Sequence, residues 1–310
     1  MTGKRNQDIL AKLALLVVAV AWGSSLVVVK SSTDLISPNL LIAMRFAIAF
    51  VTLAVIFHKK FKMINRQSVK RGAIIGFCLF LAYCSQTVGV IFAMPGKSAF
   101  LSSAYCVIVP FLFWIIEKVR PSRYNVVAAV LCTIGIVIAS VTADFTVTKG
   151  DGLALLSAFL FAAHIVSVSV CTKGEDPVVM TILQFGFSAV FSGVTALLFE
   201  RPLVLPAQTG AIGGVLYLAL VCTALSLLLQ NIGQKYTDPS SASLILSLES
   251  VFGVFFSVLF FKEELPVHLI IGFALIFLAI IISETKCSFI KKYGKITKVC
   301  SKDLERKTVE

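Results

Sequence analysis

Residues 241–261 read SASLILSLESVFGVFFSVLFF, an almost unbroken apolar run with one carboxylate, Glu249, near its centre. At about 1.5 Å per residue, a helix of this length spans the roughly 30 Å hydrocarbon core of a bilayer. An ionised side chain at that depth costs about 2.5–3.5 kcal/mol, so it persists only where it faces a partner, a wet cavity or a bound molecule. Glu249 is therefore the first candidate functional residue.

The composition is that of a polytopic membrane protein. The 310 residues are 58% hydrophobic and 14% charged, with a mean hydropathy of +0.94, whereas soluble chains are about 45–50% apolar and about 25% charged. The net charge of +12 comes from loops and the tail rather than from one basic face with interleaved aromatic residues, which argues against nucleic acid as a partner. The eight cysteines contain no C-x-x-C pair and are expected to be small buried side chains.

Ten apolar runs of helical length follow one another, separated by short breaks rich in Pro, Gly and charge. They lie at about 9–29, 39–57, 72–92, 98–116, 123–141, 152–171, 178–199, 210–230, 241–261 and 267–283. Pro and Gly end one helix and begin the next. We therefore predict an all-α polytopic membrane protein with ten transmembrane helices.

The basic residues predict the orientation of these spans. With the N-terminus inside, 22 of the 28 Lys and Arg residues fall in inner segments and five in outer loops, while Arg45 lies within a span. The positive-inside rule then places both termini in the cytoplasm and the chain in the cell (inner) membrane. The first run is predicted to be a retained helix, preceded by a cytoplasmic segment at 1–8. A basic cytoplasmic tail at 284–310 is expected to contact anionic lipids.

The chain also repeats itself. Gln86-Thr87-Val88-Gly89 near the end of the third span recurs as Gln230-Asn231-Ile232-Gly233 in the eighth, and the same offset matches Tyr105 with Glu249. Residues 9–141 and 150–283 are thus predicted to be two copies of a five-span unit. Because five is odd, the second copy is inverted, and such proteins hold a shared cavity at the membrane midplane. We expect spans 1, 3, 4, 6, 8 and 9 to line it.

These features resemble the EamA-domain branch of the drug/metabolite transporter (DMT) superfamily over residues 9–284. The resemblance rests on Trp22-Gly23-Ser24-Ser25, Arg45-Phe46, Gln86 to Gly89, Tyr105 to Pro110, Gln230-Asn231, Ser247-Leu248-Glu249 and Lys262-Glu263-Glu264-Leu265. It implies secondary transport of small metabolites or drugs without implying a particular substrate. Relatives often carry Pro after the glutamate, where this chain has Ser250, which leaves a helix break at that point open.

Depth in the membrane and this resemblance nominate the residues that meet a substrate. The substrate-binding candidates are Trp22, Ser24, Ser25, Tyr83, Gln86, Tyr105, His164, Gln230, Asn231 and Glu249. Glu249 is also the candidate for proton coupling, because loss of hydration favours the neutral form of a carboxyl group; a purely structural hydrogen-bonding role is the alternative. Arg45 is predicted to be a structural intramembrane charge. For the aromatic candidates and His164, plain packing remains the competing interpretation.

The prediction is a secondary-active transporter of a small organic compound that is amino-acid-like, nucleobase-like or cationic. We expect alternating access and export with proton coupling or exchange. The chain has no G-x-x-x-x-G-K-[ST] phosphate loop and no H-E-x-x-H motif, so neither ATP hydrolysis nor a metal site is predicted, and no cofactor. An integral-membrane enzyme acting on lipid head groups and a passive channel are the alternatives. The assembly state is left open, with a homodimer among the options.

Overall fold

In the computed structural model, which describes residues 2–140, 148–200, 203, 209–237 and 239–285, every regular element is a helix. The first half contains α1 (Thr2–Thr33), α2 (Pro38–Ile56), the short 3₁₀ helix η1 (His58–Met63), α3 (Arg66–Ile91), α4 (Pro95–Ser102), α5 (Tyr105–Glu117) and α6 (Arg123–Ser140). The second half contains α7 (Lys149–Cys171), α8 (Pro177–Phe199), α9 (Thr209–Ala219), the π-helical turn η2 (Leu220–Leu225), α10 (Ser226–Tyr236), α11 (Pro239–Leu246), α12 (Glu249–Phe261) and α13 (Val267–Thr285).

These elements are compatible with the ten apolar segments that the sequence predicts. Among the described residues, seven helical segments are long and apolar enough to cross a membrane, and shorter apolar helices lie at Arg123–Gly135, Glu249–Phe261 and Val267–Ala279. The eighth span continues to Tyr236, six residues beyond its predicted end. Residue 141, predicted to end the first repeat, and the tail from residue 286 lie outside the described residues.

Spans 4 and 9 are each broken into two helices at equivalent positions. Span 4 consists of α4 and α5, span 9 of α11 and α12, and the bounds of the second pair lie 144 residues after those of the first. Both spans end at a lysine in the left-handed region, Lys118 with φ of 59° and Lys262 with φ of 51°. Span 9 is therefore broken even though Ser250 replaces the proline of relatives, and the break lies directly before Glu249.

Helix packing follows a pseudo-two-fold relation between the halves. When each span is exchanged for its counterpart, α3 against α7 becomes α10 against α1, and both contacts occur. The contact of α4 with α12 likewise has its mate in α11 with α5, and that of α1 with α12 in α7 with α5. The pairs α2 with α8 and α6 with α13 map onto themselves. Since each unit has five spans, this relation inverts the second unit relative to the first.

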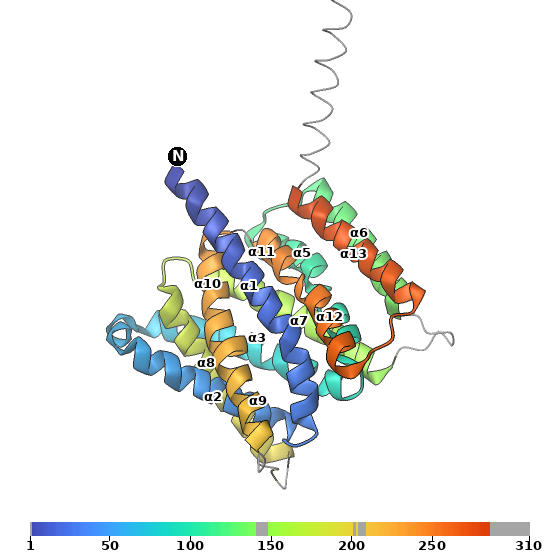
Figure 1. Cartoon of the computed structure of the whole chain (residues 1–310). Coiled ribbons are helices and arrows are strands. Elements are labelled where there is room, and N and C mark those ends of the chain that lie inside the picture. The colour runs from blue at the N-terminus through green and yellow to red at the C-terminus, as the bar shows by residue number, and fades with distance from the viewer. Residues whose placement is uncertain (1, 141–147, 201–202, 204–208, 238, 286–310) are drawn as a thin grey trace, which may run out of the picture.

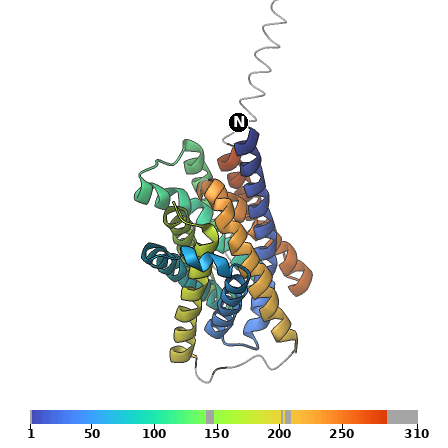
Figure 2. The same cartoon turned by 90° about the vertical axis from the view of Figure 1, so that its left-hand side faces the viewer.

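The ends of the described chain lie on one face of the bundle. Figures 1 and 2 both show the start of α1 and the end of α13 at the same end of the molecule, as an even number of crossings requires. We call this end the termini face and the other end the opposite face. In Figure 1, α6 and α13 pack together at one edge of the bundle, and the central cavity described below lies among the remaining helices.

Candidate functional site

A small, largely enclosed cavity lies between the two halves, at the breaks in spans 4 and 9. It is lined by Trp22, Ser25, Leu26, Tyr83, Gln86, Tyr105, Phe161, His164, Ile165, Gln230 and Glu249. These residues come from α1, α3, α5, α7, α10 and α12, which belong to the same six spans that the sequence predicts. The cavity volume is about 10 Å³, room for about one water molecule. An organic molecule therefore enters only if the surrounding helices separate.

The helix breaks place Glu249 and Tyr105 at the centre of this cavity. Each is the first residue of the second half-helix of its span, so Glu249 lies where the α12 dipole favours negative charge. Glu249 is buried with 6% of its surface exposed and Tyr105 with 1%. The Tyr105 hydroxyl lies close to the Glu249 carboxyl. No hydrogen bond of ordinary geometry joins them, and Tyr105 Oη has no partner among the described residues.

His164 and Gln230 supply polar groups from the second half. His164 Nε2 donates to Gln184 Oε1 over 3.2 Å, which holds the imidazole against the cavity wall. Gln230 is fully buried, and within the described chain neither of its side-chain amide atoms has a hydrogen-bond partner. Gln230 lies six residues before the end of α10, so loop water does not reach it in this conformation. An unpaired amide at this depth is available to a ligand.

Arg45 does not line the cavity but contacts residues of its wall. Its Nε donates to Thr223 Oγ1, and its Nη2 donates to the Cys222 carbonyl over 3.4 Å and to Tyr83 Oη over 3.5 Å. The guanidinium carbon lies 4.6 Å from the centre of the Tyr83 ring, a cation–π arrangement. No ion pair joins Arg45 to Glu249 in the described part of the chain. These contacts favour the structural role predicted for Arg45.

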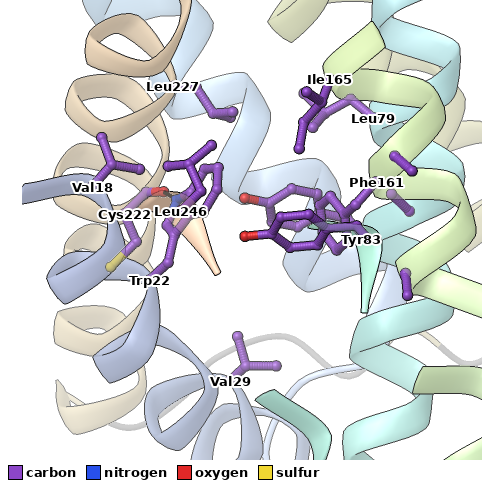
Figure 3. Packing of buried hydrophobic residues seen from close by; sticks show 14 of the residues in the cluster. Val18, Trp22, Val29, Leu79, Tyr83, Phe161, Ile165, Cys222, Leu227 and Leu246 are labelled. Carbon is purple, nitrogen blue, oxygen red and sulfur yellow. Dashed lines mark hydrogen bonds between the residues drawn. The ribbon is translucent and has the colours of Figure 1, made fainter. Parts of the chain in front are cut away.

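The π-helical turn η2 positions the Cys222 carbonyl and the Thr223 hydroxyl that Arg45 contacts. A π turn shifts the backbone hydrogen-bond register, and the hydroxyls of Thr223 and Ser226 donate to carbonyls five residues earlier. The Cys222 carbonyl accepts from Trp22 Nε1 over 2.9 Å. Figure 3 shows Trp22 and Cys222 on one side of this region, with Tyr83 and Phe161 on the other. One carbonyl thus orients Trp22 and Arg45, and through Arg45 also Tyr83.

Two predicted site residues lie away from the central cavity. Asn231 is buried and its Nδ2 donates to Thr181 Oγ1 over 2.7 Å, so it braces α10 against α8. Ser24 hydrogen-bonds to Tyr217 Oη over 2.6 Å and lines a groove on another face of α1. The other eight substrate-binding candidates all line the central cavity.

The groove beside Ser24 is larger than the central cavity but chemically plainer. It has a volume of about 880 Å³ and lies among α1, α9 and α12. Its lining is apolar apart from serine and tyrosine hydroxyls and includes no carboxyl, imidazole or basic side chain. Val17 and Val20 on its wall are exposed, as lipid-facing residues are. We therefore take the central cavity as the candidate functional site.

Sequence reasoning missed several residues around the cavity. Phe161, Ile165 and Leu26 are ordinary apolar positions that only packing brings to the wall. Gln184, which holds His164, carries a sequence signal, since Gln184-Phe185 matches Arg45-Phe46 in the repeat. Each of these two matched residues hydrogen-bonds to a residue that lines the cavity: Arg45 donates to Tyr83, and Gln184 accepts from His164. Among the described residues no group of three or more His, Cys, Asp or Glu side chains could hold a metal ion.

Both halves of the chain match a known protein family. The EamA-like transporter family matches residues 9–141 and again residues 148–285. The chain belongs to the EamA-like transporter family. It is also 34% identical over 276 residues to an "Uncharacterized transporter" of Archaeoglobus fulgidus, covering 88% of this chain and 85% of that protein. This EamA-like protein is accordingly a membrane transporter of the drug/metabolite transporter superfamily, and the same likeness points away from an enzymatic role.

A solved structure supports the fold independently of the family. A chain titled "Crystal structure of protein" superposes on 90% of this EamA-like chain and 98% of its own length, with a TM-score of 0.68. Their sequences are 18% identical, so the likeness concerns the fold alone.

Proposed function

We propose that this protein is a secondary-active transporter that moves a small organic compound across the cytoplasmic membrane by alternating access, with Glu249 as the proton-coupling group. The substrate class is an amino-acid-like, nucleobase-like or cationic compound, and the direction is export. Both termini lie in the cytoplasm. The single observation that carries the proposal is a buried carboxyl group at a helix break in a cavity between two related halves.

The surroundings of Glu249 support proton exchange. No Lys or Arg in the described chain forms an ion pair with it, so no fixed cation holds it permanently ionised. A carboxyl group cut off from water takes up a proton, and releases it when water or a cation reaches the site. Trp22, Tyr83 and Tyr105 supply aromatic rings beside the carboxyl group, a combination suited to an organic amine or cation.

The contacts at the two faces support alternating access. On the termini face, Lys60 pairs with Asp176, Arg71 with Glu175 over 3.1 Å, and Glu117 with Lys173 over 2.6 Å. Each of these pairs joins the first half of the chain to the second.

On the opposite face, Lys97 pairs with Asp151 over 3.0 Å, and Glu263 accepts from the backbone N–H groups of Gly96 and Lys97. These contacts also join the two halves. Contacts between the two halves thus close both sides of the cavity, and opening one side requires that the contacts on that side separate.

Transport by purified protein in sealed vesicles tests the proposal. An imposed pH gradient should drive uptake or release of a compound found by a thermal-shift screen of amino acids, nucleobases, sugars and organic cations. Glu249→Gln should abolish the response to the pH gradient, because the glutamine amide cannot take up and release a proton as a carboxyl group does. Glu264→Gln, at an exposed position, is the matched control. Unchanged rate and pH dependence in Glu249→Gln would overturn the proton role.

A further inference from the structure

The half of the molecule between the cavity and the termini face contains buried polar side chains on α10 and at the residue that follows it, and we call this set the α10 stripe. Gln230 and Gln234 lie one turn apart on α10, and Thr237 follows the helix directly in an extended conformation. The three residues are 0%, 6% and 8% exposed. Within the described residues, the Gln230 and Gln234 amide atoms and Thr237 Oγ1 all lack a hydrogen-bond partner. A buried polar group without a partner costs free energy. A row of them therefore favours a conformation in which water reaches it.

The positions equivalent to Gln234 and Thr237 on the other side of the cavity carry apolar side chains. The offset of 144 residues that relates the two halves matches Gln230 with Gln86, Gln234 with Val90 and Thr237 with Ala93. Val90 is fully buried, and hydrating it would cost free energy rather than release it. The two halves are thus related in fold but differ at these matched side chains. The polar groups near Val90 are partnered in part, since its carbonyl accepts a hydrogen bond from Lys30 Nζ over 2.9 Å.

The ion pairs at the two faces differ in the same direction. Asp151, which pairs with Lys97 on the opposite face, is 1% exposed, and separating it would leave an uncompensated buried charge. The side chains of the three pairs on the termini face are between 11% and 55% exposed. Partly exposed pairs cost less to separate than a pair with a fully buried member, because water solvates the separated charges. Opening is therefore easier on the termini face.

We propose that the α10 stripe of Gln230, Gln234 and Thr237 lines the access path between the cavity and the termini face, and that this path is filled with water when the protein has no substrate. The occupants are water and then the hydrophilic part of the substrate. The inference rests on the proposed alternating-access function and specifies which side is open at rest. The path past Val90 stays closed until substrate is bound.

Thiol labelling of the full-length protein tests the access path. In a variant with all eight native cysteines replaced by serine or alanine, one cysteine is introduced by Gln234→Cys, Leu15→Cys or Val90→Cys. Leu15 is fully buried and contacts Gly233, so it controls for depth in the membrane. A small cationic methanethiosulfonate reagent is added to either side of sealed vesicles without substrate or a gradient.

We expect Gln234→Cys to react from the termini face at least about tenfold faster than Leu15→Cys, because a hydrated thiol ionises and a dry one does not. Val90→Cys should not react from the opposite face. Equal rates for Gln234→Cys and Leu15→Cys would overturn the proposal, as would fast reaction of Val90→Cys from the opposite face.

A second measurement leaves the native cysteines in place and so does not depend on folding of the cysteine-free variant. In Gln234→Met an apolar side chain of similar length replaces the amide. A hydrated amide predicts an unchanged or lower melting temperature, whereas a permanently dry, unpaired amide predicts a higher one. A rise would overturn the access path. Neither measurement needs a substrate or proton coupling, so failure here and failure of the Glu249→Gln experiment are distinguishable.

Discussion

Arg45 is 2% exposed, and protein groups take the place of water around its guanidinium. Thr223, Tyr83 and the Cys222 carbonyl accept its hydrogens, and the face of the Tyr83 ring adds a cation–π contact. Buried charge of this kind is tolerated only with such partners. At the residue scale, Arg45 thus supports the cavity wall, whereas Glu249 faces the cavity itself.

Arg45→Ala should lower stability, because Thr223, Tyr83 and the Cys222 carbonyl lose a shared donor. We expect a loss of about 1–3 kcal/mol, measured as a lower melting temperature in detergent. Arg66→Ala, at an exposed position, should leave the melting temperature nearly unchanged. Equal melting temperatures for wild type and Arg45→Ala would contradict the bracing role.

The Asp176 carboxyl group, at the start of α8, should make the stability of the protein depend on pH. Burial raises the pKa of its carboxyl group, but hydrogen bonds from Lys60 and from backbone N–H groups lower the pKa by more, so the net shift is downward. A lowered pKa means stability that is present above the ordinary value of about 3.9 and lost as the pH falls through the folded-state value.

Asp176→Asn should therefore lower the melting temperature most at pH 7 and progressively less below about pH 4. Asparagine still caps the helix, so the difference isolates the charge. Melting curves of both proteins between pH 7 and pH 3 provide the measurement. A difference that stays constant across this range would be inconsistent with the carboxylate as its source.

At the scale of elements, the contact between α1 and α12 depends on glycine. A Cβ atom on Gly23 would lie 2.4 Å from Phe252 Cβ, and one on Gly253 would lie 2.5 Å from Ala99 Cβ. Both distances are shorter than real Cβ contacts. The absent side chains let α12 approach α1 and α4 closely, and this approach brings Glu249 to the cavity.

Gly253→Ala should destabilise the protein by about 1–3 kcal/mol through overpacking, although alanine favours helix formation. Gly152→Ala is the matched control, since a Cβ at Gly152 would meet nothing within 4 Å. It should be neutral or slightly stabilising. The melting temperatures of the two variants provide the measurement, and equal values would show that the contact between α12 and α4 can relax.

The broken spans illustrate what a local pattern predicts and what it leaves open. Apolar length predicts a span at 241–261, and the repeat offset pairs Tyr105 with Glu249. The π-helical turn at Leu220–Leu225 has no comparable signal, because LVCTAL reads as ordinary apolar helix. Its register shift depends on the contacts of Cys222 and Thr223 with Trp22 and Arg45, which are far away in sequence.

At the scale of the whole molecule, the inverted repeat predicts which loops share a face. Lys149 begins α7 and Lys173 follows its end, so the two should lie on opposite sides of the membrane. Lys149→Cys and Lys173→Cys in the cysteine-free variant should react with an impermeant thiol reagent from opposite sides of sealed vesicles, Lys173→Cys from the termini face. Labelling of both from the same side would contradict the antiparallel arrangement.

The class of fold can be predicted from local features of the sequence. Ten apolar runs, the distribution of Lys and Arg and the internal repeat follow from the cost of placing polar groups in hydrocarbon, which acts residue by residue along the chain. The sequence also nominated most of the cavity residues, because an intramembrane Glu249 or His164 needs a partner wherever it lies.

Which of these candidates face one another depends on how the helices pack. Ser24 and Ser25 are neighbours in the chain, but a helix turns about 100° per residue, and the packing of α1 directs one to the outer groove and the other to the cavity. The partners of Arg45, the support of His164 by Gln184, and the unpaired stripe on α10 are likewise long-range contacts or their absence within the described chain. They depend on how helices distant in sequence pack, which no local pattern encodes.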